Sequence, residues 1–265
     1  MLRASDVWFA YDRTQVLRGV GLAVPAGAIV GILGPNGSGK TTLLRVLAGT
    51  RRPQRGSVTL DGAPLTSFSR AGLARRMAAV PQETHLAFDY TVAEVAMMGR
   101  YPHLGAFEIE GPSDVAVTEE MLAATGTLHL KERLFATLSG GEKQRVVIAA
   151  ALAQIETRRG AGKEADGGLL LLDEPTASLD LKYQLEIAAL LRRLHDERGL
   201  TILISTHDLG LAGTLCEALL MIRGGEVVAD GDTDRVLSAP NIRAVFDVDA
   251  EVIQRSGRRI VVPLR

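Results

Sequence analysis

Three places along the chain carry residue types that could act on phosphate groups. The first is Gly34–Thr42, GPNGSGKTT, which lies between the apolar runs Ala28–Leu33 and Leu43–Ala48. Its glycines let backbone N–H groups converge on one anion, and a following helix adds its positive dipole end. Lys40 can then reach the β- and γ-phosphates, and the Thr41 hydroxyl can ligate Mg²⁺. The alternative, an ordinary glycine-rich turn with a solvated lysine, is disfavoured by the strand before it and the helix after it.

The second place is a pair of carboxylates, Asp173 and Glu174, directly after the apolar run Leu169–Leu172. Two carboxylates at the end of a buried strand are unfavourable unless they have partners or a function. One can hold Mg²⁺, and the other can polarise an attacking water molecule. Beside a phosphate-binding loop, we favour this functional interpretation.

Two more polar residues follow strand-like runs. Gln82 comes after Met77–Val80, and His207 comes after Leu200–Ser205. Because α/β sheets bind their ligands at the carboxyl ends of the strands, both side chains could reach the same ligand. For Gln82, a solvated loop residue is the alternative.

The third place is Leu138–Glu142, LSGGE, before the helical run Lys143–Ala153. A hydroxyl and free N–H groups at a helix start can bind an anion, and an ordinary helix cap is the alternative. Tyr11 lies in a turn of the N-terminal block, where it could stack on a purine or simply pack.

The surrounding sequence predicts an α/β protein. Residues 2–25 read as an antiparallel flap, and residues 85–154 read as a helical segment because Ala, Glu, Met and Leu dominate. The polar segment Gly160–Gly168 predicts a surface loop. Later elements are expected as a helix containing Ile187, Leu190, Leu191 and Leu194, strands at Ala218–Ile222 and Glu226–Ala229, a helix at Thr233–Leu237, and a terminal hairpin turning at Ser256-Gly257.

Composition excludes several classes of function. The net charge is −1 and aromatic residues make up 4% of the 265 residues, so neither a basic field nor stacking platforms favour nucleic acid. The single cysteine, Cys216, excludes an internal disulfide and fits a reducing cytoplasm. The longest apolar run is too short to span a bilayer, so we expect a membrane role only through a partner.

The order of these motifs resembles the ATP-binding subunit of ABC transporters over essentially the full chain. By this resemblance, the motifs are the Walker A loop Gly34–Thr41, the Walker B strand Leu169–Asp173, the Q-loop residue Gln82, the signature motif Leu138–Glu142, the D-loop Ser178–Asp180, the switch histidine His207 and the aromatic A-loop residue Tyr11. Glu142 departs from the glutamine of many members.

The resemblance implies one ABC ATPase domain with a P-loop NTPase (RecA-like) core. That core would comprise residues 1–84 and 156–265, with an antiparallel β flap, and residues 85–155 would form an inserted α-helical subdomain. The reaction implied is hydrolysis of ATP with Mg²⁺.

The resemblance also implies the roles of individual residues. Glu174 would activate water, His207 would hold the γ-phosphate and water in line, and Lys40, with Gln82, would complete the catalytic set. Mg²⁺ would be held by Thr41, Gln82 and Asp173. The nucleotide contacts would be Tyr11, Gly34, Pro35, Asn36, Gly37, Ser38, Gly39, Lys40, Thr41, Thr42, Ser139, Gly140, Gly141, Glu142 and Asp180.

The resemblance further implies partners. Two copies would pair head to tail, so that Ser139 and Gly141 of one copy close over ATP on the loop of the other. A membrane permease dimer would dock in a groove between Gln82 and the helical subdomain, and an external binding protein would act indirectly. The expected location is the cytoplasmic face of the bacterial inner membrane.

The cargo is indicated by two segments. Phe88–His103 resembles the same stretch of importers for ferric siderophores, haem and cobalamin, and Gln154–Gly168 resembles the extended loop of haem-importer ATPases. We therefore favour haem import, with ferric siderophore or cobalamin as alternatives. An exporter ATPase has the same chemistry, but Phe88–His103 favours import. A soluble non-transport ABC ATPase usually has paired cassettes or long coiled coils, and a non-catalytic regulator should lack Glu174 or His207.

Overall fold

The computed structural model describes residues 1–84, 86–156, 167–177, 179–255 and 258–264. Its contacts divide the chain into two compact units. Unit 1 comprises Met1–Ser67 with Thr201–Arg265, and unit 2 comprises Phe68–Leu200. This division by contacts does not test where the inserted helical subdomain begins and ends. The boundaries expected at residues 84–85 and 155–156 therefore stay a prediction.

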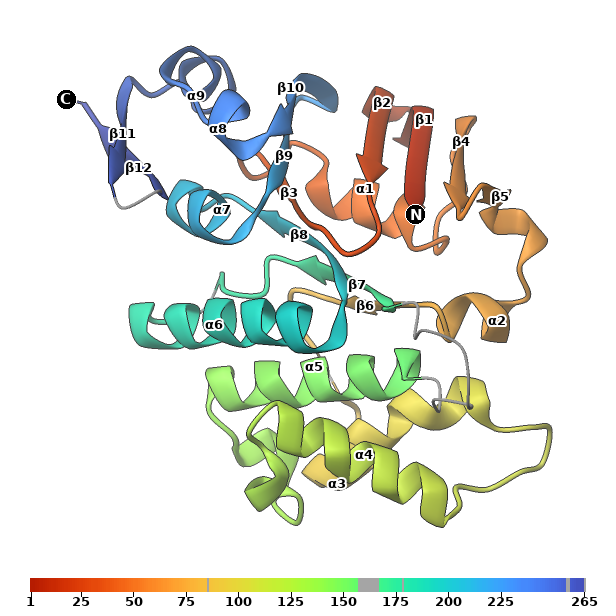
Figure 1. Ribbon diagram of the computed structural model, residues 1–265. Coiled ribbons are helices and arrows are strands. Elements are labelled where there is room, and N and C mark those ends of the chain that lie inside the picture. The colour runs from red at the N-terminus through yellow and green to blue at the C-terminus, as the bar shows by residue number, and fades with distance from the viewer. Residues whose placement is uncertain (85, 157–166, 178, 256–257, 265) are drawn as a thin grey trace. The chain divides into compact units, whose positions relative to one another are not determined.

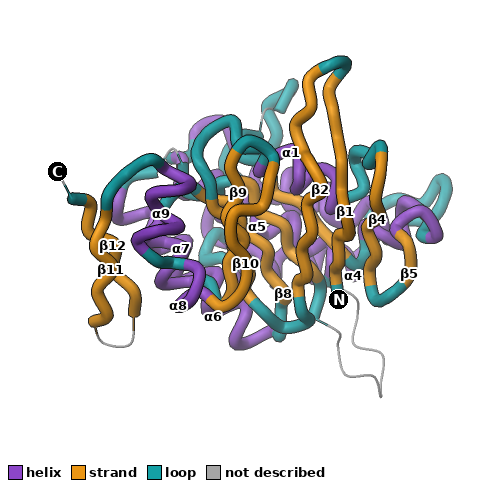
Figure 2. The backbone as a smooth tube through the Cα atoms, turned by 90° about the horizontal axis from the view of Figure 1, so that it is seen from above, coloured by secondary structure: helices purple, strands orange, loops and turns teal. Residues whose placement is uncertain are grey.

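Unit 1 begins with an antiparallel sheet of order β2-β1-β4-β5 (Figure 2). Its strands are β1 (Leu2–Tyr11), β2 (Thr14–Val24), β4 (Arg55–Leu60) and β5 (Ala63–Pro64), and the short 3₁₀ helix η1 (Leu65–Ser67) follows. Apolar side chains of β1 such as Val7 and Phe9 are buried while polar neighbours are exposed, as expected for a sheet with one covered face. The predicted antiparallel flap is confirmed.

The second sheet of unit 1 carries the loop Gly34–Thr42. In this unit it has the order β10-β9-β3-β8, with β9, β3 and β8 parallel and β10 antiparallel. The strands are β3 (Ile29–Leu33), β8 (Thr201–Thr206), β9 (Ala218–Arg223) and β10 (Glu226–Asp232). Every residue of β3 and β8 is buried, and apolar residues predominate in both strands, as expected for parallel strands covered on both faces. The helix α1 (Lys40–Leu47) packs on β8, and α7 (Leu209–Leu215) packs on β3 and β8.

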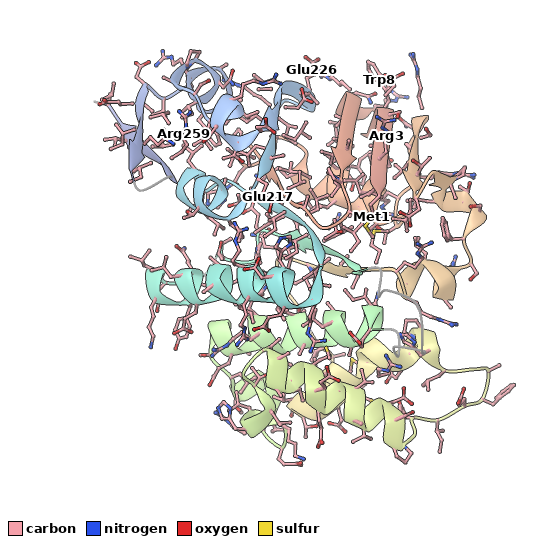
Figure 3. All side chains as sticks on the ribbon, in the orientation of Figure 1. Met1, Arg3, Trp8, Glu217, Glu226 and Arg259 are labelled. Carbon is pink, nitrogen blue, oxygen red and sulfur yellow. The ribbon has the colours of Figure 1, made fainter. Side chains whose placement is uncertain are left out.

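The C-terminal part of unit 1 is a short helical segment followed by a hairpin (Figure 1). Its elements are α8 (Thr233–Val236), α9 (Ala239–Phe246), β11 (Ala250–Arg255) and β12 (Arg258–Pro263). Strands β11 and β12 pair in antiparallel register, as predicted, and the expected turn at residues 256–257 lies outside the described residues. Arg259 of β12, labelled in Figure 3, forms an ion pair of 3.1 Å with Asp234 of α8.

Unit 2 pairs two parallel strands with two long helices. Strand β6 (Met77–Val80) pairs with β7 (Leu169–Asp173), α5 (Gly140–Ile155) packs on both strands, and α6 (Leu181–Arg198) contacts α5. On α6, the predicted apolar stripe is buried: Ile187, Leu190, Leu191 and Leu194. Residues 160–166 of the predicted loop lie outside the described residues.

The remaining helices of unit 2 are α2 (Arg70–Ala74), α3 (Val92–Met97), η2 (Met98–His103), α4 (Pro112–Ala124), η3 (Leu128–Leu130) and η4 (Phe135–Thr137). Of these helices, α3, α4 and η2 pack on α5. Helix α4 begins at Pro112, directly after its N-cap Gly111, because proline suits the first helical turn. Among the described residues, we find no helix with the length and apolar character needed to cross a bilayer.

Arg100 and His103 hold the C-terminal end of α5. Arg100, only 5% exposed, forms an ion pair of 3.0 Å with Asp114 and donates to the carbonyl oxygens of Ala153 and Glu156 at 2.7 and 3.1 Å. His103 bonds the Gln154 carbonyl at 2.8 Å. These contacts satisfy carbonyls that a helix end leaves without intrahelical partners.

Candidate functional site

The loop Gly34–Thr42 joins β3 to α1 in unit 1, as the sequence predicts. The Gly34 N–H donates to the carbonyl of Thr206 at 3.4 Å, which fixes the start of the loop against β8. Gly39 is the N-cap of α1 with φ = 104°, a conformation that disfavours any other residue. Among the residues that the structure describes, no side chain caps this helix start. The first N–H groups of α1 are therefore not bound by a capping side chain, which is the arrangement that suits an anion.

Three polar side chains of this loop are buried, those of Ser38, Lys40 and Thr42. Lys40 is 4% exposed, and its Nζ donates to the carbonyls of Gly34 and Pro35 at 2.8 and 3.1 Å. The Ser38 hydroxyl is also buried and has no hydrogen-bond partner in the described part of the chain. A buried donor without a partner is unfavourable. A buried ammonium and an unpartnered hydroxyl among glycines fit an anionic ligand such as a polyphosphate.

A turn far along the sequence supports the loop. The Gly225 N–H, between β9 and β10, donates to the Ser38 carbonyl at 3.1 Å. A Cβ atom on Gly34 would lie 2.3 Å from the Ile222 carbonyl oxygen, so only glycine fits where β9 passes. Sequence reasoning did not single out this turn, although its Gly224-Gly225 pair was a visible signal.

Tyr11 lies beside the first helix after the loop. Its hydroxyl accepts a hydrogen bond of 3.4 Å from Arg45 Nη1, and its ring meets that of Phe9 edge-on at 4.9 Å. Burial raises the pKa of Tyr11, but hydrogen bonds from Arg45 and Thr42 outweigh it, so the pKa lies below its ordinary value. Tyr11 is thus placed next to the loop, and Arg45 is a contact that the sequence did not reveal.

His207 follows β8 at the edge where the loop begins. The register of the parallel strands pairs Leu33 with Thr206, so Gly34 and His207 leave the sheet at the same end. His207 is exposed, and the next residue, Asp208, caps α7 by accepting the N–H groups of Gly210 and Leu211. Unit 1 therefore places Tyr11 beside α1 and His207 at the strand edge where the loop begins.

Gln82, Asp173 and Glu174 share one strand edge in unit 2. The register pairs Val80 with Leu172, so the residues after both strands emerge at the same end. Asp173 and Glu174 are 8% and 9% exposed, whereas Gln82 is exposed. Glu174 has φ = 44°, in the left-handed region that non-glycine residues rarely occupy. Such strain is common at functional sites and was not visible in the sequence.

The turn Ser139–Glu142 begins α5 with a capping box. Glu142 Oε2 accepts the Ser139 N–H at 2.8 Å and the Ser139 hydroxyl at 2.9 Å, while the Ser139 hydroxyl accepts the Glu142 N–H at 3.4 Å. These bonds from the Ser139 N–H and hydroxyl lower the pKa of Glu142 below its ordinary value. Gly141 is buried, and a Cβ atom there would lie 2.5 Å from the ring of Tyr183.

Asp180 is the N-cap of α6 and accepts the N–H of Tyr183 at 3.1 Å. Ser178, the first residue of the predicted D-loop, lies outside the described residues. Within the described part of the chain, no three His, Cys, Asp or Glu side chains gather as a ready metal site. The predicted Mg²⁺ ligands Thr41, Gln82 and Asp173 are instead few and oxygen-bearing, which suits an ion that also binds substrate phosphates.

Comparisons with known protein families and sequences give a consistent result. The model of the family described as "ABC transporter" matches residues 17–177. The chain is 40% identical over 252 residues to the hemin import ATP-binding protein HmuV of Bradyrhizobium diazoefficiens, covering 95% of this chain and 90% of the relative. It is 38% identical to the cobalamin import ATP-binding protein BtuD of Halobacterium salinarum, covering 90% of this chain and 57% of that relative.

Solved structures of ABC transporter proteins are also similar to this chain. A chain of an inward-facing metal-chelate type ABC transporter superposes with a TM-score of 0.83 at 28% identity, covering 100% of this chain and 97% of that one. A dimeric bacterial ABC transporter cassette superposes with a TM-score of 0.73 at 28% identity, covering 88% of this chain and 99% of that one. The predicted P-loop NTPase fold is confirmed by these matches.

Proposed function

The chain belongs to the ABC transporter family as an ATP-hydrolysing import subunit, and we propose that it powers the uptake of haem through a separate membrane permease. The observation that carries the ATPase chemistry is the loop Gly34–Thr42, with its buried Lys40 and a Ser38 hydroxyl that has no partner among the described residues. The preference for haem rests on the hemin import relative and on the resemblance of residues 88–103 and 154–168.

Each unit contributes its own residues to the reaction. In unit 1, Lys40 and the loop N–H groups hold the phosphates, Tyr11 stacks on the purine, and His207 orients the γ-phosphate. In unit 2, Glu174 accepts a proton from the attacking water, and Gln82 lies at the same strand edge. Bound Mg²⁺, held by Thr41, Gln82 and Asp173, would offset the negative charge that develops on the phosphates.

Two copies of the chain pair head to tail in this proposal. Ser139 and Gly141 of one copy close over ATP held by the loop of the other, with Asp180 near the contact. The existence of a dimeric cassette of related sequence supports the pairing. Association then depends on ATP, because the nucleotide lies between the two copies.

The permease docks on a groove in unit 2. A cavity of about 400 Å³ opens there beside Phe88, whose side chain is 73% exposed. It is lined by Thr84, Leu86, Ala87, Phe88, Asp89, Phe135, Ala136 and Lys143. Of the stretch Phe88–His103, Phe88 and Asp89 line this groove, whereas Arg100 and His103 are engaged at the end of α5. The occupant we propose is a segment of the permease, which would hold this subunit at the cytoplasmic face of the bacterial inner membrane.

A second cargo has specific support. The relative that imports cobalamin matches this chain almost as well as the hemin import protein does. Ferric siderophores remain the third chelate of the same group. The extended loop that favours haem lies largely outside the described residues, so transport must distinguish these cargoes.

The catalytic part of the proposal is tested by Glu174→Gln. This variant should bind ATP as tightly as the wild type but hydrolyse it at least about 100-fold more slowly, because the general base is lost. Glu251→Gln, an exposed change on β11, is the control and should hydrolyse ATP normally. Turnover is followed by phosphate release, and nucleotide affinity by calorimetry. Near-normal hydrolysis in the Glu174→Gln protein would remove Glu174 from this role.

A further inference from the structure

The helix starts of α3 and α5 carry the same capping box. At α5, Glu142 Oε2 accepts the N–H and the hydroxyl of Ser139 at 2.8 and 2.9 Å. At α3, Glu94 Oε2 accepts the N–H and the hydroxyl of Thr91 at 2.7 and 2.8 Å. In both boxes, a glutamate carboxylate accepts the donors of the N-cap residue. The box at α3 is therefore a matched reference for the box at α5.

The box at α5 occupies both donors that Ser139 offers. A serine hydroxyl has one proton, and here that proton is directed to Glu142 Oε2 together with the backbone N–H. A second acceptor at this turn would have to displace the carboxylate from them. Because these bonds lower the pKa of Glu142, the carboxylate is charged at neutral pH.

The charge of Glu142 is only partly offset by its surroundings. Arg133 and Arg145 are the basic groups that act on it electrostatically. Arg145 is itself within 3.6 Å of Glu186, and Arg133 donates to the Thr137 carbonyl at 3.3 Å. An anion arriving at Ser139 would therefore meet a like charge as well as occupied donors, and both effects oppose its binding.

We propose that Glu142 competes with the γ-phosphate of ATP on the second copy for the donors of Ser139, and so sets the ATP concentration at which two copies associate. This inference rests on the proposed head-to-tail pairing. Glu142 is a positioning residue here, because it acts through Ser139. A glutamine at this position keeps an oxygen acceptor for the box but carries no charge, so it would release Ser139 more readily.

The test measures ATP-dependent association of the full chain by sedimentation, in the Glu174→Gln background so that ATP is not consumed. Adding E142Q should lower the ATP concentration for half-maximal dimer by about tenfold, the effect of roughly 1.4 kcal/mol less repulsion and competition. Adding E94Q removes the same charge from the matching box on α3 and should leave that concentration unchanged.

Three outcomes decide the matter. A selective shift with E142Q supports the inference. An ATP requirement that is the same or higher with E142Q, or that falls equally with E94Q, overturns the inference alone. Failure of the Glu174→Gln protein to dimerise, although it binds ATP by calorimetry, overturns the proposed pairing and the inference with it. Thermal unfolding without nucleotide checks that E142Q and E94Q are folded.

Discussion

The two glycine-rich turns of this chain look alike in sequence but differ in how their donors are used. Both pair serine with glycine ahead of a helix, at Gly34–Thr42 and at Leu138–Glu142. The first enters α1 through Gly39, with no side-chain cap and with the Ser38 hydroxyl unpartnered in the described structure. The second enters α5 through a complete capping box.

In our proposal, the first turn is a preformed anion site, whereas the second turn must be opened before an anion can bind. The first turn keeps donors available and holds Lys40 within the loop, so it can bind phosphate by itself. The second turn has already satisfied its Ser139 donors with Glu142, so an anion there must compete with a carboxylate. Two glycine-rich turns that precede helices can therefore differ in how readily they bind an anion.

Replacing the lysine of the first turn, and the lysine that follows the second turn, should give the largest contrast. Lys40→Ala should weaken ATP binding by about 100-fold, since charge-assisted hydrogen bonds contribute about 1.5–3 kcal/mol. Lys143→Ala, in the first turns of α5, should leave ATP binding to the single chain unchanged. Titration with a fluorescent ATP analogue measures both. Equal losses for the two variants would contradict the distinction between the turns.

A glycine-to-alanine change in each turn should give the second-largest difference, in the free energy of unfolding. Gly34→Ala brings a Cβ atom within 2.3 Å of the Ile222 carbonyl and should cost about 1–3 kcal/mol of unfolding free energy. Among the described residues, the Cβ atom of Gly140→Ala meets only the Cδ2 atom of Leu179, at 3.2 Å, and that flexible side chain can move. Chemical denaturation should show a loss for the first variant alone. A stable Gly34→Ala protein would mean that the loop is not held tightly against β9.

Removing each serine hydroxyl should affect the stability of the nucleotide-free chain differently: Ser139→Ala should lower it, and Ser38→Ala should not. Ser139→Ala loses a helix cap and should destabilise the chain by about 1 kcal/mol. Ser38→Ala removes a buried hydroxyl that has no partner in the described part of the chain, so stability should hold or rise by about 1 kcal/mol. Thermal and chemical unfolding compare the two. A loss of stability in Ser38→Ala would show that its hydroxyl is already satisfied.

Low pH should weaken the capping box of the second turn, because Glu142 becomes protonated. Its pKa is lowered from 4.5 in the folded chain, so its contribution to stability is complete above about pH 4.5 and is lost as the pH falls through the folded value. E142Q should therefore flatten the acid side of the stability profile slightly. Unfolding curves between neutral pH and pH 3 measure this. A profile identical to that of the wild type would show that the box does not depend on the charge.

Local features of the fold and site were predictable from sequence. The loop Gly34–Thr42, its strand and its helix are adjacent in the chain, and the apolar runs of β3, β7 and β8 announce buried parallel strands. The polar residues that follow these strands could be placed at strand ends for the same reason. Their assigned roles in hydrolysis stay a prediction.

Contacts between distant segments could not be predicted. The Gly225 N–H supports Ser38 from far along the chain, and Arg100 reaches the end of α5 across more than fifty residues. The sequence suggested that Phe88–His103 is one functional motif. In the structure, Arg100 and His103 bind the C-terminal end of α5, whereas Phe88 lines the groove. The left-handed backbone of Glu174 likewise depends on its surroundings, because intrinsic preference disfavours it.

The most direct test is transport. The chain would be reconstituted with its permease in ATP-loaded vesicles and offered haem, cobalamin or a ferric siderophore, each with its cognate binding protein. We predict ATP-dependent accumulation of haem with the wild type and none with Glu174→Gln. Accumulation of another chelate would correct the cargo but keep the importer. ATP hydrolysis without accumulation of any chelate would contradict the proposal that this subunit powers iron-chelate or corrin uptake.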